Sequence, residues 1–137
     1  MGVLIDTSVL IEYERRRLNL EPHLAAHEHE EFFVSVITAS ELLHGVHRAV
    51  DPQIRLKRSS FVEALLERFP LLPVDLATAR IHAQLWAELA GAGKMVGPND
   101  LWIAAAALAH GLTMVTANVR EFDRVPGLIV EAWAEPS

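Results

Sequence analysis

Short apolar runs alternate along the chain with stretches in which apolar residues recur every third or fourth position. The runs are apolar throughout and lack the alternation of a half-exposed strand, so they predict strands that are buried on both faces. The predicted strands are residues 3–5, 32–36, 71–74, 112–116 and 128–130.

The stretches between these runs predict helices, because their apolar residues gather on one helical face. Asp6, Thr7 or Ser8 is expected to cap the first helix, and Asn99 to cap the most apolar one. Gly111 is expected to end that apolar helix as its C′ residue. The predicted helices are residues 9–17, 21–30, 38–50, 52–69, 77–89 and 100–109, with a polar turn or short helix at 118–123.

Strands that alternate with helices in this way are typical of an α/β fold. Because each strand is short and apolar without alternation, we expect a short, mainly parallel central sheet in a three-layer α/β/α arrangement. The length of 137 residues is enough for one hydrophobic core, so we expect residues 1–137 to form a single domain.

Composition narrows the class of protein. The chain has no cysteine, which excludes disulfides, thiolate metal sites and a cysteine nucleophile. No run is long and apolar enough to span a membrane, and the N-terminus lacks the basic region of a signal peptide, so we expect a cytoplasmic protein. The net charge of -6 argues against a protein that coats nucleic acid by charge alone.

Candidate chemistry lies where polar residues follow apolar strands, because open parallel sheets bind ligands beyond the carboxyl ends of their strands. Asp6 and the turn at residues 116–118 occupy such positions. Asp100 begins the most apolar helix, and Glu41 lies early in a helix that follows a strand. Taken singly, each has an ordinary explanation as a cap, a turn residue or a solvated side chain.

Convergence changes that interpretation. If the first and fourth strands are neighbours, Asp6, Asp100 and residue 118 lie at one end of the sheet, within reach of Glu41. Carboxylates ~4 Å apart repel by about 4 kcal/mol per pair at an effective dielectric of ~20, so such a cluster needs protons or a cation. Oxygen ligands suit Mg²⁺ or Mn²⁺, which would leave positions for a substrate phosphate.

Four segments in order resemble the four motifs of the PIN domain: residues 3–8 (VLIDTS), 40–45 (SELLHG), 99–104 (NDLWIA) and 116–122 (TANVREF). The resemblance covers essentially the whole chain, and it is strongest to the VapC-type toxins of bacterial toxin-antitoxin pairs. It implies a PIN-like fold and a cytoplasmic, metal-dependent endoribonuclease that hydrolyses RNA phosphodiester bonds. It also implies a homodimer and a cognate antitoxin protein as partner.

The resemblance further implies roles for individual residues. Asp6, Glu41 and Asp100 would hold Mg²⁺ or Mn²⁺ and carry catalysis with Asn118. The hydroxyls that would orient the carboxylates or a bound water are those of Thr7, Ser8 and Thr116.

The chain departs from the wider PIN pattern at Asn118, where a fourth acid often stands. An amide oxygen can coordinate but brings no charge. With three carboxylates counted instead of four, we expect one well-held ion, chiefly on Asp6 and Asp100, and only weak binding of a second.

Other residues are candidates for substrate or partner contact. His44 and Arg48 lie one and two turns beyond Glu41 on the same helical side, and Arg15 belongs to the basic end of the first helix. The glycine-rich residues 91–97 lack the ending of a nucleotide P-loop and predict a flexible loop at the rim of the site.

Two alternatives remain open at this stage. A phosphatase could use Asp6 as a covalent nucleophile, although Ser8 stands where such enzymes need a second acid. A PIN-like module could bind RNA or protein without cleavage, although clustered carboxylates are costly in a surface that holds no metal.

Overall fold

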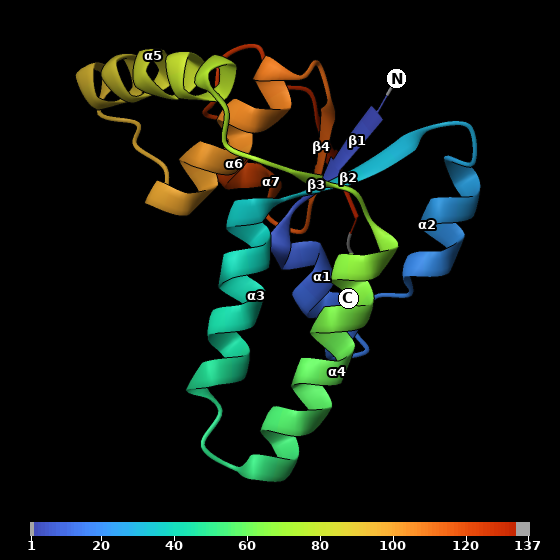
Figure 1. Cartoon of the computed structure of the whole chain (residues 1–137). Helices are drawn as coiled ribbons and strands as arrows, with labels where there is room; N and C mark the ends of the chain where they lie inside the picture. Colours follow the sequence, from blue (N-terminus) through green and yellow to red (C-terminus); the bar gives the residue numbers. More distant parts are fainter. Residues whose placement is uncertain (1, 134–137) are drawn as a thin grey trace.

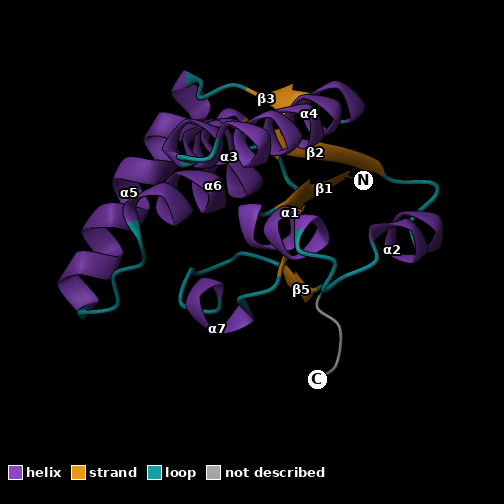
Figure 2. Cartoon of the chain, turned by 90° about the horizontal axis from the view of Figure 1, so that it is seen from below, coloured by secondary structure: helices purple, strands orange, loops and turns teal. Residues whose placement is uncertain are grey.

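The computed structural model describes residues 2–133, and a five-stranded parallel sheet forms its centre. The strands lie in the order β3-β2-β1-β4-β5, and Figure 2 shows β3, β2, β1 and β5 in this sequence with α5 and α6 on one side and α2 on the other. Every neighbouring pair is parallel. The strands are β1 (Gly2–Ile5), β2 (Glu31–Ser35), β3 (Leu71–Leu72), β4 (Thr113–Thr116) and β5 (Val130–Ala132).

Helices cover both faces of the sheet, which confirms the predicted three-layer α/β/α arrangement (Figure 1). Helices α3 and α4 pack together as a hairpin that extends away from the sheet. The helices are α1 (Thr7–Glu14), α2 (Leu20–Ala26), α3 (Val36–Arg48), α4 (Pro52–Arg68), α5 (Leu76–Ala92), α6 (Pro98–Ala109) and α7 (Val119–Phe122).

The pleat of β1 divides the hydrophobic core in two. Val3 and Ile5 face a cluster built with α1 to α4, whereas Leu4 faces a second cluster built with α5, α6 and α7. All three side chains are at most 1% exposed. Successive residues of a strand point to opposite faces, so a central strand needs apolar residues at every position. That requirement explains why β1 reads as a continuous apolar run.

Several boundaries differ from the predictions because capping groups, rather than periodicity, set them. Helix α3 begins at Val36 instead of residue 38, since the Ser35 hydroxyl accepts a hydrogen bond from the Ile37 amide at 3.0 Å. Helix α6 begins at Pro98 with Gly97 as its N-cap, so the prediction that Asn99 caps it is wrong. Proline suits this first position because its missing N–H would have had no helical partner.

Two further differences lie at the predicted loop and the last strand. Helix α5 continues through Gly91 to Ala92, which leaves only residues 93–97 as the loop before α6. The last strand is Val130–Ala132 instead of 128–130, because Val130 is the residue that pairs with Met114 of β4. Gly111 has a φ of 64° and ends α6 as predicted.

Within residues 2–133, none of the helices combines the length and the apolar character that crossing a membrane requires.

Candidate active site

The predicted site residues meet beyond the carboxyl ends of β1 and β4. These strands are paired, with Ile5 opposite Val115, so Asp6 and Thr116 follow side by side. The Asp6 amide continues the ladder by donating to the Val115 carbonyl at 2.9 Å. The expectation that the first and fourth strands are neighbours is therefore confirmed.

Asp6 is 3% exposed, and two hydroxyls hold its carboxylate. Its Oδ2 accepts hydrogen bonds from Ser8 Oγ at 2.6 Å and from Thr116 Oγ1 at 2.8 Å. The Ser8 hydroxyl in turn accepts from the Ala117 amide at 3.0 Å, and the Thr116 hydroxyl from the Asn118 amide at 2.9 Å. Because each hydroxyl has one proton, these backbone donors direct both protons toward Asp6.

The other oxygen of the same carboxylate has no partner. Asp6 Oδ1 is buried and makes no hydrogen bond within the described residues. Burial raises the pKa of Asp6, while the hydrogen bonds from Ser8 and Thr116 oppose that shift. A buried carboxylate oxygen without a partner is unfavourable, and a cation beside it would remove the penalty.

Glu41 is half-buried on α3 and is held from α1. The Thr7 hydroxyl donates to Glu41 Oε1 at 2.6 Å and lies 2.9 Å from the hydroxyl of Thr38. Thr7 is the first residue of α1, directly after Asp6. The turn that positions Asp6 therefore also orients Glu41.

Asp100 lies in the first turn of α6 and is half-buried. The pKa of Asp100 is raised to about 8, and burial is the largest cause. A hydrogen bond to Glu121 and the nearby charges of Asp6, Glu121 and Glu41 contribute to the same shift. Asp100 and Glu41 also line one hollow together with residues 97–99. Four carboxylates therefore act on each other at this edge of the sheet.

Glu121 is the acid that the sequence analysis missed. It lies on α7, where its Oε1 accepts from the Gly97 amide at 2.8 Å and its Oε2 from Asn118 Nδ2 at 3.0 Å. Asn118 is exposed and uses its amide to hold this acid. The count of three carboxylates is thus wrong, because Glu121 supplies the fourth. Its spacing of three residues from Asn118, one helical turn, is the signal that could have found it.

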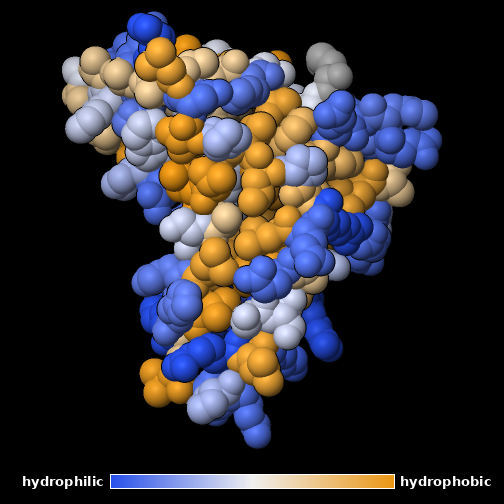
Figure 3. All heavy atoms as spheres, viewed as in Figure 1, coloured by the Kyte–Doolittle hydropathy of each residue, from blue (hydrophilic) through white to orange (hydrophobic). Residues whose placement is uncertain are grey.

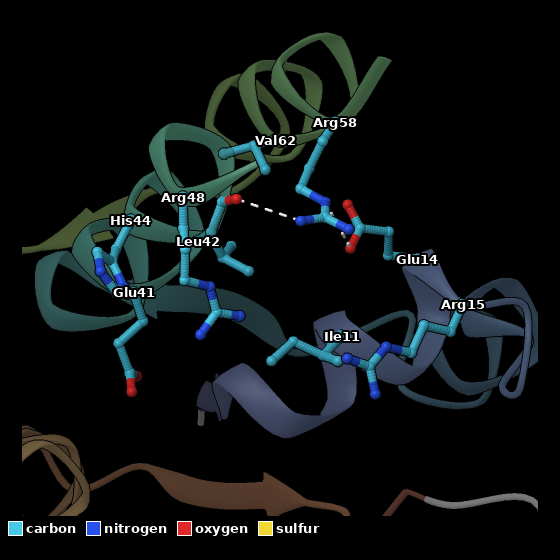
Figure 4. A pocket seen from close by; sticks show the side chains of 10 residues that line it. Ile11, Glu14, Arg15, Glu41, Leu42, His44, Arg48, Arg58 and Val62 are labelled. Carbon is cyan, nitrogen blue, oxygen red and sulfur yellow. Dashed lines mark hydrogen bonds and ion pairs between the residues drawn. The ribbon is translucent and has the colours of Figure 1, made fainter. Parts of the chain in front are cut away.

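The predicted contact residues line a neighbouring pocket that Glu41 also borders. His44 and Arg48 come from α3, and Arg15 comes from the end of α1 (Figure 4). Arg58 of α4 points into the same space and donates to the Gly45 carbonyl at 3.2 Å. Basic side chains thus lie directly beside the acidic site.

The acidic site suits a divalent cation in the chemistry of its donors. Within residues 2–133, no group of three or more acidic or histidine side chains lies close enough together to hold a metal ion as it stands. The partnerless oxygen of Asp6 and the raised pKa of Asp100 nevertheless show that ionised carboxylates are unfavourable here, a penalty that a bound cation would remove. Hard oxygen ligands of this type favour Mg²⁺ or Mn²⁺.

Comparisons with known proteins identify the relatives of this chain. The sequence profile of the PIN domain matches residues 3–128. The tRNA(fMet)-specific endonuclease VapC of Salmonella typhimurium is 35% identical over 137 residues, covering 95% of this chain and 96% of the relative. Ribonuclease VapC1 of Rickettsia felis is 32% identical over 130 residues and covers 95% of each chain.

Solved structures show the same similarity in three dimensions. DNA-bound VapBC from Salmonella typhimurium superposes with a TM-score of 0.85 at 31% identity, covering 98% of this chain and 99% of that one. VapBC2 from Rickettsia felis, bound to a DNA fragment from its promoter, gives a TM-score of 0.86 at 27% identity, covering 97% and 99%.

Proposed function

This chain belongs to the PIN domain family, among the VapC ribonucleases, and we propose that it is the metal-dependent toxin nuclease of a toxin-antitoxin pair. The observation that carries the metal-dependent activity is the buried, partnerless oxygen of Asp6 within a group of four interacting carboxylates. The proposed ligands are Asp6, Asp100 and Glu41, with Glu121 beside them.

The chain's own residues prepare this site. A divalent ion bound there would polarise the RNA phosphate, activate water and offset charge on the leaving oxygen. Ser8 and Thr116 hold Asp6 in one orientation, and Thr7 does the same for Glu41. Because these hydrogen bonds exist before any ligand binds, the carboxylates need little reorganisation.

Protons are the second part of the mechanism. Asp100, whose pKa is raised to about 8, carries a proton at neutral pH in the metal-free protein. That proton must leave when the carboxylate takes a cation, since only the ionised form binds metal strongly. Asn118 and the Gly97 amide hold Glu121 against Asp100 and so keep this pair together.

RNA cleavage with and without metal tests the proposal. Labelled RNA is incubated with wild-type protein and Asp6→Asn in Mg²⁺, Mn²⁺ or excess EDTA. We expect cleavage by the wild type in metal only, and a rate at least about 100-fold lower for Asp6→Asn. Cleavage that persists in EDTA would contradict metal dependence. An absence of cleavage with either ion would favour a binding module without nuclease activity.

Initiator tRNA is the first substrate to test. The relatives from Salmonella typhimurium and Shigella flexneri are named tRNA(fMet)-specific endonucleases. We propose the same RNA class for this chain, with an elongator tRNA as the comparison. Equal cleavage of both tRNAs would contradict this choice.

An antitoxin and a second copy of the chain are the proposed partners. Solved relatives from three bacteria are VapBC assemblies. Apolar side chains lie on the surface of this chain, over the α3–α4 hairpin and elsewhere, including Val50 at 89% and Leu56 at 71% exposed (Figure 3). Light scattering of the chain, alone and co-expressed with the adjacent reading frame, tests both partners. A monomer in both preparations would overturn them.

A further inference from the structure

A basic groove begins at the acidic site and continues along the end of α1. The pocket beside Glu41 shares Glu14, Arg15 and Arg58 with a second hollow between α1 and α4. Together the two hollows make one continuous depression. We define the basic groove by its cationic side chains, which are Arg15, Arg16, Arg48, Lys57 and Arg58.

Most of these cations have no side-chain partner among residues 2–133. Arg58 donates to the Gly45 carbonyl and lies 3.9 Å from Glu14. By contrast, the side chains of Arg15, Arg16, Arg48 and Lys57 are exposed and form no hydrogen bond or ion pair with any residue from 2 to 133. The chain as a whole carries 12 basic against 18 acidic residues, so this local excess of positive charge opposes the overall balance.

The end of α1 holds part of the groove in a defined shape. The Arg16 amide donates to the Tyr13 carbonyl at 3.1 Å, and the Arg17 amide to the Glu12 carbonyl at 2.8 Å. These two bonds form a Schellman motif, in which Arg16 takes the left-handed conformation with a φ of 59°. Glycine usually occupies that position because the left-handed conformation disfavours a side chain. This chain nevertheless has an arginine there.

The side chains point to a ligand with repeated negative charge. Figure 4 shows the guanidinium groups of Arg48 and Arg15 reaching into one pocket from two different helices, with Glu41 at its border. Guanidinium groups bind phosphate oxygens in paired hydrogen bonds. A strand whose scissile phosphate lies at the carboxylates must cross the adjoining surface, where its next phosphates would meet these arginines.

We propose that Arg15 and Arg48 form a subsite for a backbone phosphate of single-stranded RNA that flanks the bond being cut. The inference rests on the proposed nuclease function. Arg16 and Lys57 extend the subsite along the groove, and Arg58 supports it from α4. The half-buried rings of Tyr13 and Phe61, 5.5 Å apart, form an apolar wall at the far end. A strand held in this way is positioned by its phosphates, independently of its bases.

RNA binding in EDTA tests the subsite without relying on catalysis. An unstructured RNA oligonucleotide is titrated with wild type, Arg15→Ala and Arg48→Ala at several salt concentrations. We expect each variant to bind about tenfold more weakly at low salt, with the slope of log affinity against log salt reduced by about 0.7. Arg80→Ala is the matched control, because Arg80 is exposed on α5 outside the groove. Its substitution removes the same charge as the two groove variants. It should retain the wild-type slope.

Neutral phosphate analogues then locate the contact. Methylphosphonates are placed one at a time on each side of the cleaved bond. A methylphosphonate at one flanking position should weaken RNA binding by the wild type and by Arg80→Ala, but should have little effect on RNA binding by Arg48→Ala. The subsite would be contradicted if the methylphosphonate weakened RNA binding equally in all variants, or if Arg15→Ala and Arg48→Ala bound RNA like the wild type. The groove would then be assigned to a protein partner.

The two proposals fail in different ways. If RNA is cleaved in metal but the groove variants bind like the wild type, only the phosphate subsite is wrong. If the salt slopes change as expected but no RNA is cleaved with Mg²⁺ or Mn²⁺, the subsite remains and the nuclease function is wrong. Thermal unfolding of each variant verifies that the substitution leaves the fold intact.

Discussion

At the scale of single residues, the two oxygens of Asp6 have different surroundings. Oδ2 accepts two hydrogen bonds from hydroxyls that backbone amides orient, whereas Oδ1 is buried without a partner. This asymmetry fits the proposed role of Asp6 as a metal ligand, because one oxygen is fixed to the protein and the other could take a cation. The hydroxyls therefore have a predictable effect on activity.

Replacing Thr116 by valine removes one of these hydroxyls at nearly constant volume. We expect Thr116→Val to lower metal affinity or cleavage rate by about 10- to 100-fold, because partners that orient metal ligands typically contribute that much. Thr113→Val is the control: Thr113 lies on the same strand and its side chain makes no hydrogen bond within residues 2–133. Metal titration and cleavage rates provide the measurement. Equal losses in both variants would indicate damage to β4 rather than to the site.

Asp100 makes the stability of the metal-free protein depend on pH. Its pKa is raised from 3.8 to about 8 in the folded state, so between these values the folded protein retains a proton that the unfolded chain has lost. The free energy of unfolding should therefore fall as pH rises through this window. The stabilisation is complete below pH 3.8 and is lost as pH passes about 8.

Thermal unfolding in EDTA at pH 5 to 9 measures this effect. We expect the midpoint of the wild type to decrease toward pH 8, and the decrease to be smaller in Asp100→Asn, which cannot ionise. Because a cation favours the ionised form, added Mg²⁺ or Mn²⁺ should bind more tightly at pH 8 than at pH 5. Identical pH profiles for the two proteins would argue against the raised pKa.

At the scale of elements, three helices end in the Schellman motif, but the residue in its left-handed position differs. That residue is Gly93 after α5, Gly111 after α6 and Arg16 after α1. In α5 the Lys94 amide donates to the Leu89 carbonyl at 2.8 Å, which closes the helix beyond Ala92. Gly91 consequently lies inside the helix, where its glycine character serves no conformational purpose.

Gly91 and Gly93, which are only two positions apart, should therefore respond oppositely to substitution by alanine. Gly91→Ala should stabilise the fold by about 0.5–1 kcal/mol, because alanine is the better helix former and an added Cβ meets nothing within 4 Å. Gly93→Ala should destabilise it by about 1–2 kcal/mol, because its φ of 68° disfavours a side chain. Urea unfolding gives both values. Changes of the same sign would contradict this end of α5.

At the scale of the whole molecule, the active site depends on the complete fold. Asp6 follows β1, and the other three carboxylates come from α3, α6 and α7. The parallel sheet and the helices packed on it bring these elements together, since Glu41, Asp100 and Glu121 lie far from Asp6 along the chain. An ion that binds these carboxylates together would bind the folded state and not the unfolded chain, and would therefore stabilise the fold.

Metal should therefore raise the unfolding temperature. At a concentration 100 times its dissociation constant, an ion specific for the folded state adds about 2.7 kcal/mol. For a domain of this size, that corresponds to a shift of roughly 10 °C. Calorimetry of wild type and Asp6→Asn, with Mg²⁺ or with EDTA, measures the difference. A shift of equal size in Asp6→Asn would place the ion elsewhere.

Sequence by itself determined the order of the elements, the α/β class and the end of α6 at Gly111, because these depend on neighbouring residues. It also singled out Asp6, which directly follows an apolar strand, Asp100 at the start of the most apolar helix and Glu41 early in a helix that follows a strand. These features require only the period of apolar positions and the conformational preferences of single residues.

Only the tertiary structure decided which distant groups meet. The contacts of Glu121 with the Gly97 amide and with Asp100, the hydrogen bond from Thr116 to Asp6 and the basic groove all join residues far apart along the chain. The register of β1 against β4 and the packing of α1, α3 and α4 set those distances. Local propensity has no term for contacts of this kind, because they follow from the packing of whole elements.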